Sequence, residues 1–204
     1  MQLRIPLNTT ESQVQRLIEL QAVFAQACNA LTLVVQKTRV WNRVALHHLA
    51  YKDLRAQYPA MGSQMACNAI YSVSRTCRLL FQHPASPFNL ASRADKPLPL
   101  VKFDDTCPVY FDRHTLSLRE GQISMLTLDG RMRFQLALQP ADEACFHSQK
   151  LREVVLSRSS PTTFVLVFSL SEANEPADTT LPEQADIPQY LLIEEAPDAK
   201  NQPV

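Results

Sequence analysis

The chain has 204 residues, 46% of them hydrophobic, which is enough for a packed core in one sizeable domain or two small ones. Its five cysteines form no C-x-x-C pair, no apolar run approaches the ~20 residues of a membrane helix, and no signal peptide is recognisable. We therefore expect a cytoplasmic protein with buried free thiols, without a membrane segment, a zinc ribbon or a disulfide framework. The net charge of zero hides an asymmetry, because residues 1–171 hold 19 Lys and Arg against 12 Asp and Glu, whereas residues 172–204 hold one against eight.

One strand and one long helix are expected at the start of the chain. The sequence LRIPL at residues 3–7 alternates apolar and other residues, the period of a half-buried strand, and Pro6 restricts that strand to a sheet edge or a strand end. Thr10 and Gln13 have the spacing of a capping box. The apolar residues that follow predict an amphipathic helix over residues 12–35.

Two further helices are expected before residue 83. The second runs from about 38 to 56, because Pro59 pushes Tyr58 out of the helical region. The third covers residues 64–81 and is amphipathic. Its packing face is predicted to hold Ala66, Ala69, Ile70, Val73, Cys77 and Leu80, and its polar face Asn68, Tyr71, Arg75 and Arg78. The polar face is thus basic and aromatic.

The pattern then changes to strands, after a proline-rich connection at residues 83–99. Short alternating strands are expected at TLSL, ISMLTL, RMRFQLAL, REVVLSR and TTFVLVFSL, which are residues 115–118, 123–128, 131–138, 152–158 and 162–170. Asp129-Gly130 predicts a two-residue type I′ hairpin turn, in which both residues need positive φ. In the strand after that turn, Arg131, Arg133 and Gln135 are expected to face outward.

The acidic tail at residues 172–204 is proline-bearing, and most of it is expected to be disordered. Its one apolar run, IPQYLLI at residues 187–193, is a candidate for docking on a partner or on the body of the protein. Because the tail carries a net charge of −7 and the body +7, the tail can also compete with phosphate for the body.

A cluster of basic residues lies in the helical region, with Asp53 as the one acid between Lys37 and Leu80. The cluster consists of Lys37, Arg39, Arg43, Lys52, Arg55, Arg75 and Arg78. One interpretation is contact with nucleic-acid phosphates, whose neutralisation releases counterions. The other is an ordinary solvated helix face, and the residues alone do not decide between them.

Aromatic side chains are interleaved with these basic residues. Tyr71 shares its predicted face with Arg75 and Arg78 and is therefore the best candidate for stacking on a nucleobase. Trp41 and Tyr51 are expected in the core instead, as aromatic residues of amphipathic helices usually are.

Three other features of the sequence are candidate sites. Arg131 and Arg133 leave their strand on the same side, either as a phosphate grip or as ordinary exposed arginines. The pair at residues 47–48, two adjacent histidines, is not expected to bind metal, because adjacent helical positions point about 100° apart and no carboxylate or cysteine lies one turn away. The three glycines form no phosphate-binding or dinucleotide-binding fingerprint. We therefore expect no catalytic residues, metal or cofactor.

Two segments resemble a known family: YKDLRAQYPAMGSQMACNAIYSVSRTCRLLF and PLVKFDDTCPVYFDRHTLSLREGQISMLTLDGRMRFQLAL. Their Tyr-x-x-Leu-Arg helix end, Gln-x-x-x-x-Ala-Ile helix and Leu-Asp-Gly-Arg hairpin occur in the order found in the N-terminal half of TnpB-type RNA-guided nucleases and compact type V CRISPR effectors. The resemblance implies an α+β fold: a small oligonucleotide-binding-like wedge barrel (residues 1–8 and 96–171) with a three-helix recognition-like insert and linker (residues 9–95) after the first strand.

The resemblance implies binding of structured or guide RNA, and possible recognition of target DNA. The family's RuvC-like nuclease has no counterpart here, since its catalytic carboxylates and zinc cysteines are missing, so we expect the chain alone not to cleave nucleic acid. A separate nuclease or other protein subunit is a further possible partner. The alternative function is an adaptor that recruits such a partner through the acidic tail, and a decayed transposon fragment is a third interpretation.

Overall fold

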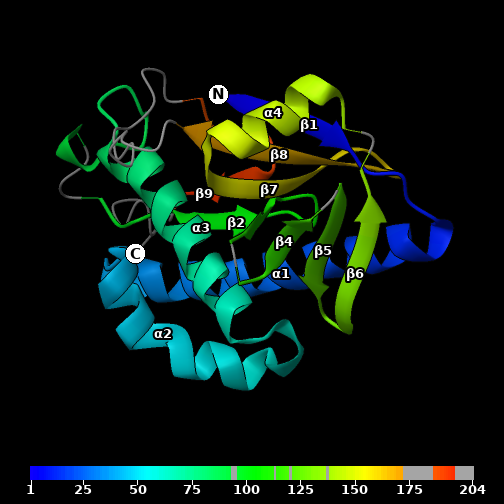
Figure 1. Cartoon of the computed structure of the whole chain (residues 1–204). Helices are drawn as coiled ribbons and strands as arrows, with labels where there is room; N and C mark the ends of the chain where they lie inside the picture. The colour runs from blue at the N-terminus through cyan, green and yellow to red at the C-terminus, as the bar shows by residue number, and fades with distance from the viewer. Residues whose placement is uncertain (93–95, 113, 120, 137, 172–185, 196–204) are drawn as a thin grey trace, which may run out of the picture.

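The computed structural model describes residues 1–92, 96–112, 114–119, 121–136, 138–171 and 186–195, which form an α+β structure (Figure 1). The helices are α1 (Glu11–Thr38), α2 (Arg43–Gln57), α3 (Ser63–Gln82) and α4 (Pro140–Ser148), with short 3-10 turns at Pro59–Met61 and Leu90–Ser92. The strands are β1 (Gln2–Pro6), β2 (Leu100–Phe103), β3 (Val109–Phe111), β4 (Leu116–Arg119), β5 (Gln122–Thr127), β6 (Gly130–Gln135), β7 (Lys150–Ser160), β8 (Thr163–Ser171) and β9 (Leu191–Glu194). The predicted α+β class is confirmed.

The described strands form three antiparallel sheets, none of which closes into a barrel. Their strand orders are β1-β8-β7-β3, β2-β9 and β4-β5-β6. β1 pairs with β8, with Leu3 opposite Phe168. Helices α1 to α3 therefore lie in the chain between the first strand of this sheet and its remaining strands, the position that the family resemblance implied.

Helix α1 begins at the predicted capping box, in which Thr10 and Gln13 each accept a hydrogen bond from the other's backbone N–H. By length and hydropathy this helix is able to cross a membrane, but half of its most apolar window is buried inside the protein. Its polar side chains serve the fold. Gln21 Nε2 donates to the Cys107 carbonyl at 3.1 Å, and Asn29 exchanges two hydrogen bonds with the backbone of Phe103.

Helix α2 begins at Arg43, five residues later than predicted. Helix α1 continues to Thr38, and Arg39 then takes a left-handed conformation (φ 57°) that ends it. Asn42 caps the new helix by accepting hydrogen bonds from the backbone N–H groups of the second and third helical residues. The boundary between the first and second helices was therefore predicted too early in the chain.

Helix α3 lies at the centre of the molecule, with twelve of its 20 residues buried. All six residues predicted for its packing face are among them. The placement of Asn68 on the opposite, exposed face was wrong: only 6% of this residue is exposed, and its Nδ2 donates to the Tyr110 carbonyl at 2.9 Å. The reason is that β3 packs on a second side of α3. Only a narrow strip of the helix remains exposed.

The β5–β6 hairpin is present, but its turn differs from the prediction. Thr127 pairs with Gly130, so the two connecting residues are Leu128 and Asp129. Only Gly130 in this turn has positive φ (104°), which excludes the predicted type I′ turn at Asp129-Gly130. Arg16 of α1 bonds the Asp129 carboxylate and so fixes the hairpin against the helix.

Several elements were not predicted, namely α4, β2, β3 and β9. β9 comes from the tail: the apolar run docks on the body, where Leu191 to Glu194 pair with β2 and Tyr190 stacks on Phe103 with ring centres 6.2 Å apart. The predicted disorder concerns mainly residues 172–185 and 196–204, which lie outside the described residues. All five cysteines are free; Cys28, Cys77 and Cys107 are buried and the other two are half-buried.

Candidate nucleic-acid interface

The exposed strip of α3 carries the polar residues of this helix. Gln64, Cys67, Tyr71, Arg75 and Arg78 follow one another at intervals of three or four residues, so they lie on one side of the helix. Arg75 is exposed and the other four are half-buried. Since the rest of α3 is largely buried, a ligand that reaches this helix meets this strip.

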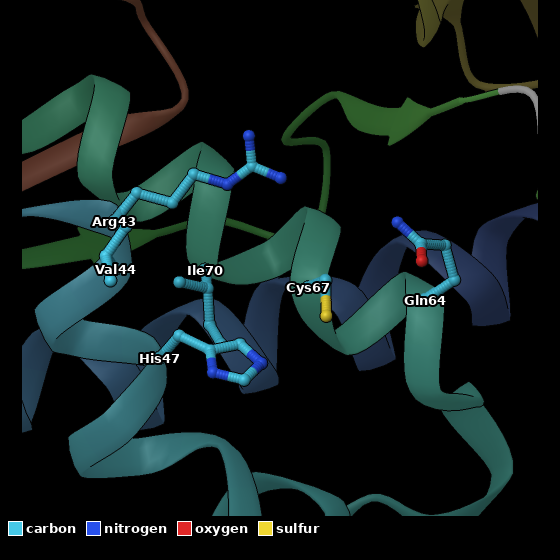
Figure 2. Close-up of a pocket in the computed structure, with 6 residues that line it drawn as sticks. All are labelled: Arg43, Val44, His47, Gln64, Cys67 and Ile70. Carbon is cyan, nitrogen blue, oxygen red and sulfur yellow. The ribbon is translucent and has the colours of Figure 1, made fainter.

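A hollow of about 380 Å³ lies between α2 and α3 (Figure 2). It is lined by Arg43, Val44 and His47 from α2 and by Gln64, Cys67 and Ile70 from α3. Figure 2 shows Arg43 extending from α2 toward α3. Its guanidinium carbon lies 5.2 Å from the centre of the Tyr71 ring, a cation–π contact. Among the described residues, Arg43 has no hydrogen bond or ion pair.

A second hollow, of about 360 Å³, lies between the start of α3 and the strands β3 and β7. Its lining residues are Gln64, Phe111, Asp112, His114, Leu151, Arg152, Glu153 and Val154. Gln64 lines both hollows, so this side chain lies between them. We call the two hollows together, with the α3 strip between Gln64 and Arg75, the α3 groove.

Glu153 of β7 holds the β7 end of the α3 groove together. Its carboxylate accepts a hydrogen bond from the Tyr71 hydroxyl at 2.9 Å and two from Arg75 Nη1 at 3.1 Å. Arg75 also lies 6.0 Å from the centre of the Tyr110 ring, and the rings of Tyr71 and Tyr110 meet edge to face. The helical insert and the β1-β8-β7-β3 sheet are therefore joined by a charged network at the groove.

The network changes the pKa values of Tyr71 and Arg75. Burial raises the pKa of the Tyr71 hydroxyl, and the negative charge of Glu153 raises it further. Burial lowers the pKa of Arg75, but Tyr110 and Glu153 outweigh this effect, and the pKa of Arg75 is raised above its usual value. Both groups therefore keep their protons at neutral pH.

The second acid of the groove, Asp112, is also used by the fold. Its carboxylate accepts hydrogen bonds from Gln64 Nε2 at 2.5 Å, from the His114 backbone N–H at 2.9 Å and from the Thr115 hydroxyl at 3.0 Å. This carboxylate holds the turn before β4 and ties it to the start of α3. The negative charge of Asp112 is therefore stabilised by hydrogen-bond donors of the protein.

The structure brings together part of the predicted set. Arg43, Tyr71 and Arg75 converge on the α3 groove, and Arg131 reaches its rim by donating to the His114 carbonyl at 2.9 Å. Arg55 lies about three turns further along α2 and donates to the Pro59 carbonyl.

Of the predicted residues, only Arg43 lines a hollow, and Tyr71 and Arg75 belong to the α3 groove through the α3 strip alone. The remaining predicted residues lie outside the groove. Lys37 and Arg39 lie at the end of α1, Lys52 is exposed on α2, and Arg78 continues the α3 strip beyond Arg75. Arg133 is exposed on β6. Trp41 and Tyr51, predicted in the core, are half-buried and pack against it.

Sequence reasoning missed most of the strand side of the groove. Glu153, Arg152, Tyr110 and His114 were not singled out, because each meets α3 or its neighbours only through the tertiary fold. Within the described residues, no three His, Cys, Asp or Glu side chains are grouped as metal ligands. A scan against protein-family models found no match to this chain, and a search of the curated proteins found none either.

Proposed function

We propose that this protein binds structured or guide RNA without cleaving it and, with that RNA, recognises DNA, as a relative of the TnpB-type proteins it resembles. The observation that carries the proposal is the α3 groove, in which Tyr71 and Arg75 of the helical insert contact the strands β3 and β7 and Arg43 lies over the Tyr71 ring. A groove between these two parts is where a duplex held by both would lie.

The charge of the groove supports a phosphate ligand. Glu153 is bonded by Arg75 and Tyr71, and Asp112 is bonded by Gln64 and its own turn. Arg43 is exposed and has no carboxylate partner among the described residues. A guanidinium offers paired donors that match a phosphate, and its charge is permanent. Arg43 is therefore the principal phosphate contact in this proposal.

Tyr71 takes a different role from the base stacking that its sequence position suggested. Arg43 lies over one face of its ring, and its hydroxyl is bonded to Glu153. In the proposal, Tyr71 orients Arg43 and Arg75 toward the groove, and a base reaches the ring only after Arg43 has moved. Tyr71 is thus mainly a positioning residue.

The finer features of the fold belong to the same proposal. The sheets β1-β8-β7-β3 and β4-β5-β6 correspond to an open form of the oligonucleotide-binding-like wedge, with α1 to α3 as the recognition-like insert. The pairing of β1 with β8 across this insert supports that correspondence. A cytoplasmic location is part of the same proposal.

The direct test is to purify the tagged protein, sequence any RNA that accompanies it and measure the affinity for that RNA at several salt concentrations. Arg43→Glu is expected to weaken binding about tenfold and to reduce the salt slope by about 1. Lys52→Glu is the matched control, because it makes the same charge change on an exposed position of the same helix outside both hollows. The proposal would be contradicted if both variants lost RNA affinity equally, or if the protein purified without nuclease treatment carried no RNA.

The second candidate function is an adaptor that recruits a protein, such as a separate nuclease subunit, through the acidic tail. The pairing of β9 with β2 occupies the apolar run of the tail, which leaves the acidic residues of segment 172–185 as the recruiting element. Neutralising Glu172, Glu175, Asp178 and Glu183 separates the functions. Loss of a protein partner with unchanged RNA affinity favours the adaptor, whereas tighter and less selective RNA binding favours an inhibitory tail.

A further inference from the structure

The sheet β4-β5-β6 has one buried and one exposed face. Ile123, Met125, Met132 and Phe134 point inward and are at most 3% exposed. Strand alternation places the residues between them on the outer face. A one-residue slip would turn these apolar side chains to solvent, so burial fixes which residues face outward.

The outer face is rich in arginine. Strand pairing sets Ser117, Ser124 and Arg133 in one row across the sheet, and Arg119 and Gln122 in the next. Arg131 lies two residues before Arg133 in β6 and is on the same side of the sheet. Among the described residues of these three strands there is no carboxylate; Asp129 lies in the turn and is bonded by Arg16, and Glu120 lies outside the described residues.

The three arginines differ in how firmly they are held. Arg131 Nη1 donates to the Ser124 carbonyl at 3.1 Å and its Nη2 donates to the His114 carbonyl at 2.9 Å, which leaves further N–H donors of a fixed guanidinium for a ligand. Arg119 and Arg133 are exposed and have no side-chain partner among the described residues. The short serines beside Arg133 leave room for a bulky group to approach.

This face is continuous with the α3 groove. His114, whose carbonyl binds Arg131, lines the second hollow. Leu126, opposite Arg131 in the sheet, lies close to the corner between α2 and α3, since a methyl group on Gly62 would be 3.7 Å from its Cδ2. A chain of phosphates that leaves the groove past His114 therefore meets Arg131 first.

We propose that the outer face of β4-β5-β6, with Arg119, Arg131 and Arg133, is a second phosphate-binding surface that extends the α3 groove and grips the backbone of the same nucleic acid. The inference rests on the proposed function. The sheet spans about 10 Å between its outer strands, which suits a short stretch of single strand. Because the outward residues described include no aromatic side chain, this surface recognises phosphates and not bases.

The test compares short and long oligouridylates, of about 6 and about 20 nucleotides, because a backbone grip is independent of sequence. The variant Arg119→Gln/Arg133→Gln neutralises two exposed strand positions. Arg4→Gln/Lys150→Gln is the matched control, because it makes the same charge change on exposed strand residues of the β1-β8-β7-β3 sheet. Thermal unfolding of each variant checks that the fold is intact.

We expect the Arg119→Gln/Arg133→Gln variant to bind the long oligonucleotide about tenfold more weakly, with a salt slope lower by about 1.4, and to bind the short one as the wild type does. The control is expected to change neither. If the variant and the control give the same affinities and slopes while Arg43→Glu still weakens binding, the second surface does not exist and the proposed function stands. If the wild type binds neither oligonucleotide, the second surface is overturned, and the proposed function is decided by the co-purifying RNA alone.

Discussion

The two ends of the α3 groove have similar volumes but use their arginines differently. At the β7 end, Arg75 forms an ion pair with Glu153, so its charge is neutralised by a partner within the protein. At the α2 end, the guanidinium of Arg43 lies over the face of Tyr71, and no carboxylate is paired with it among the described residues. A count of basic residues treats the two arginines alike. Of the two, only Arg43 can bind a ligand without first breaking an ion pair.

The comparison separates arginines that hold the fold from arginines that are available for binding. Arg16, bonded to the β5–β6 turn, belongs with Arg75 in the first group. Arg133, with no side-chain partner among the described residues, belongs with Arg43 in the second. Substitutions at the two ends of the groove should therefore have opposite effects on stability and on RNA affinity.

The largest expected effect on stability is at Glu153. Its side chain is only 18% exposed, and Glu153→Ala leaves the Tyr71 hydroxyl and Arg75 without their acceptor. We expect the free energy of unfolding to fall by about 1–3 kcal/mol, measured by urea denaturation. The released Arg75 should at the same time tighten RNA binding. Unchanged stability would show that Glu153 does not hold this end of the groove.

A smaller effect is expected at alkaline pH, where two tyrosine hydroxyls titrate. Burial raises the pKa of the Tyr110 hydroxyl well above its usual value and that of Tyr190 to about 12. Because the unfolded chain releases these protons near pH 10, stability is full below that pH and is lost as the pH rises toward about 12. Tyr190→Phe should reduce this loss of unfolding free energy by on the order of 1 kcal/mol. Coincident stability curves for wild type and variant between these pH values would contradict the assignment.

Much of the helical part of the fold could be predicted from the sequence, because its signals are local. The capping box of Thr10 and Gln13 and the packing face of α3 were confirmed. The hairpin between β5 and β6 was found too, but its turn was misplaced by one residue. A Gly after Asp satisfies several turn geometries, and strand pairing selects among them.

The candidate site could be predicted only from one side. Arg75 and Tyr71 were identified because they share a helix face, but their common partner Glu153 is 78 residues away from Arg75 in the chain. No local pattern links the two. The burial of Asn68 was missed for the same reason, since the strand that accepts its hydrogen bond arrives 42 residues later.

A still smaller effect tests an arginine outside both hollows. Arg39 has a φ of 57°, a left-handed conformation that is costly for residues other than glycine. Arg39→Gly should raise the free energy of unfolding by about 0.5–1 kcal/mol in thermal or urea unfolding. RNA affinity should stay the same, because this residue lines neither hollow. A loss of affinity similar to that of Arg43→Glu would extend the interface to the corner between α1 and α2.

The smallest expected effect on stability is at Arg43, the available arginine of the α2 end. Arg43→Met keeps much of the side chain's length over the Tyr71 ring and removes only an exposed cation–π contact, so the free energy of unfolding should change by about 0.5 kcal/mol or less. The same change removes a charge from the hollow, and RNA affinity should fall with its salt slope. A large loss of stability at Arg43 would mean that this arginine also holds the fold, and the distinction between the two ends of the groove would then disappear.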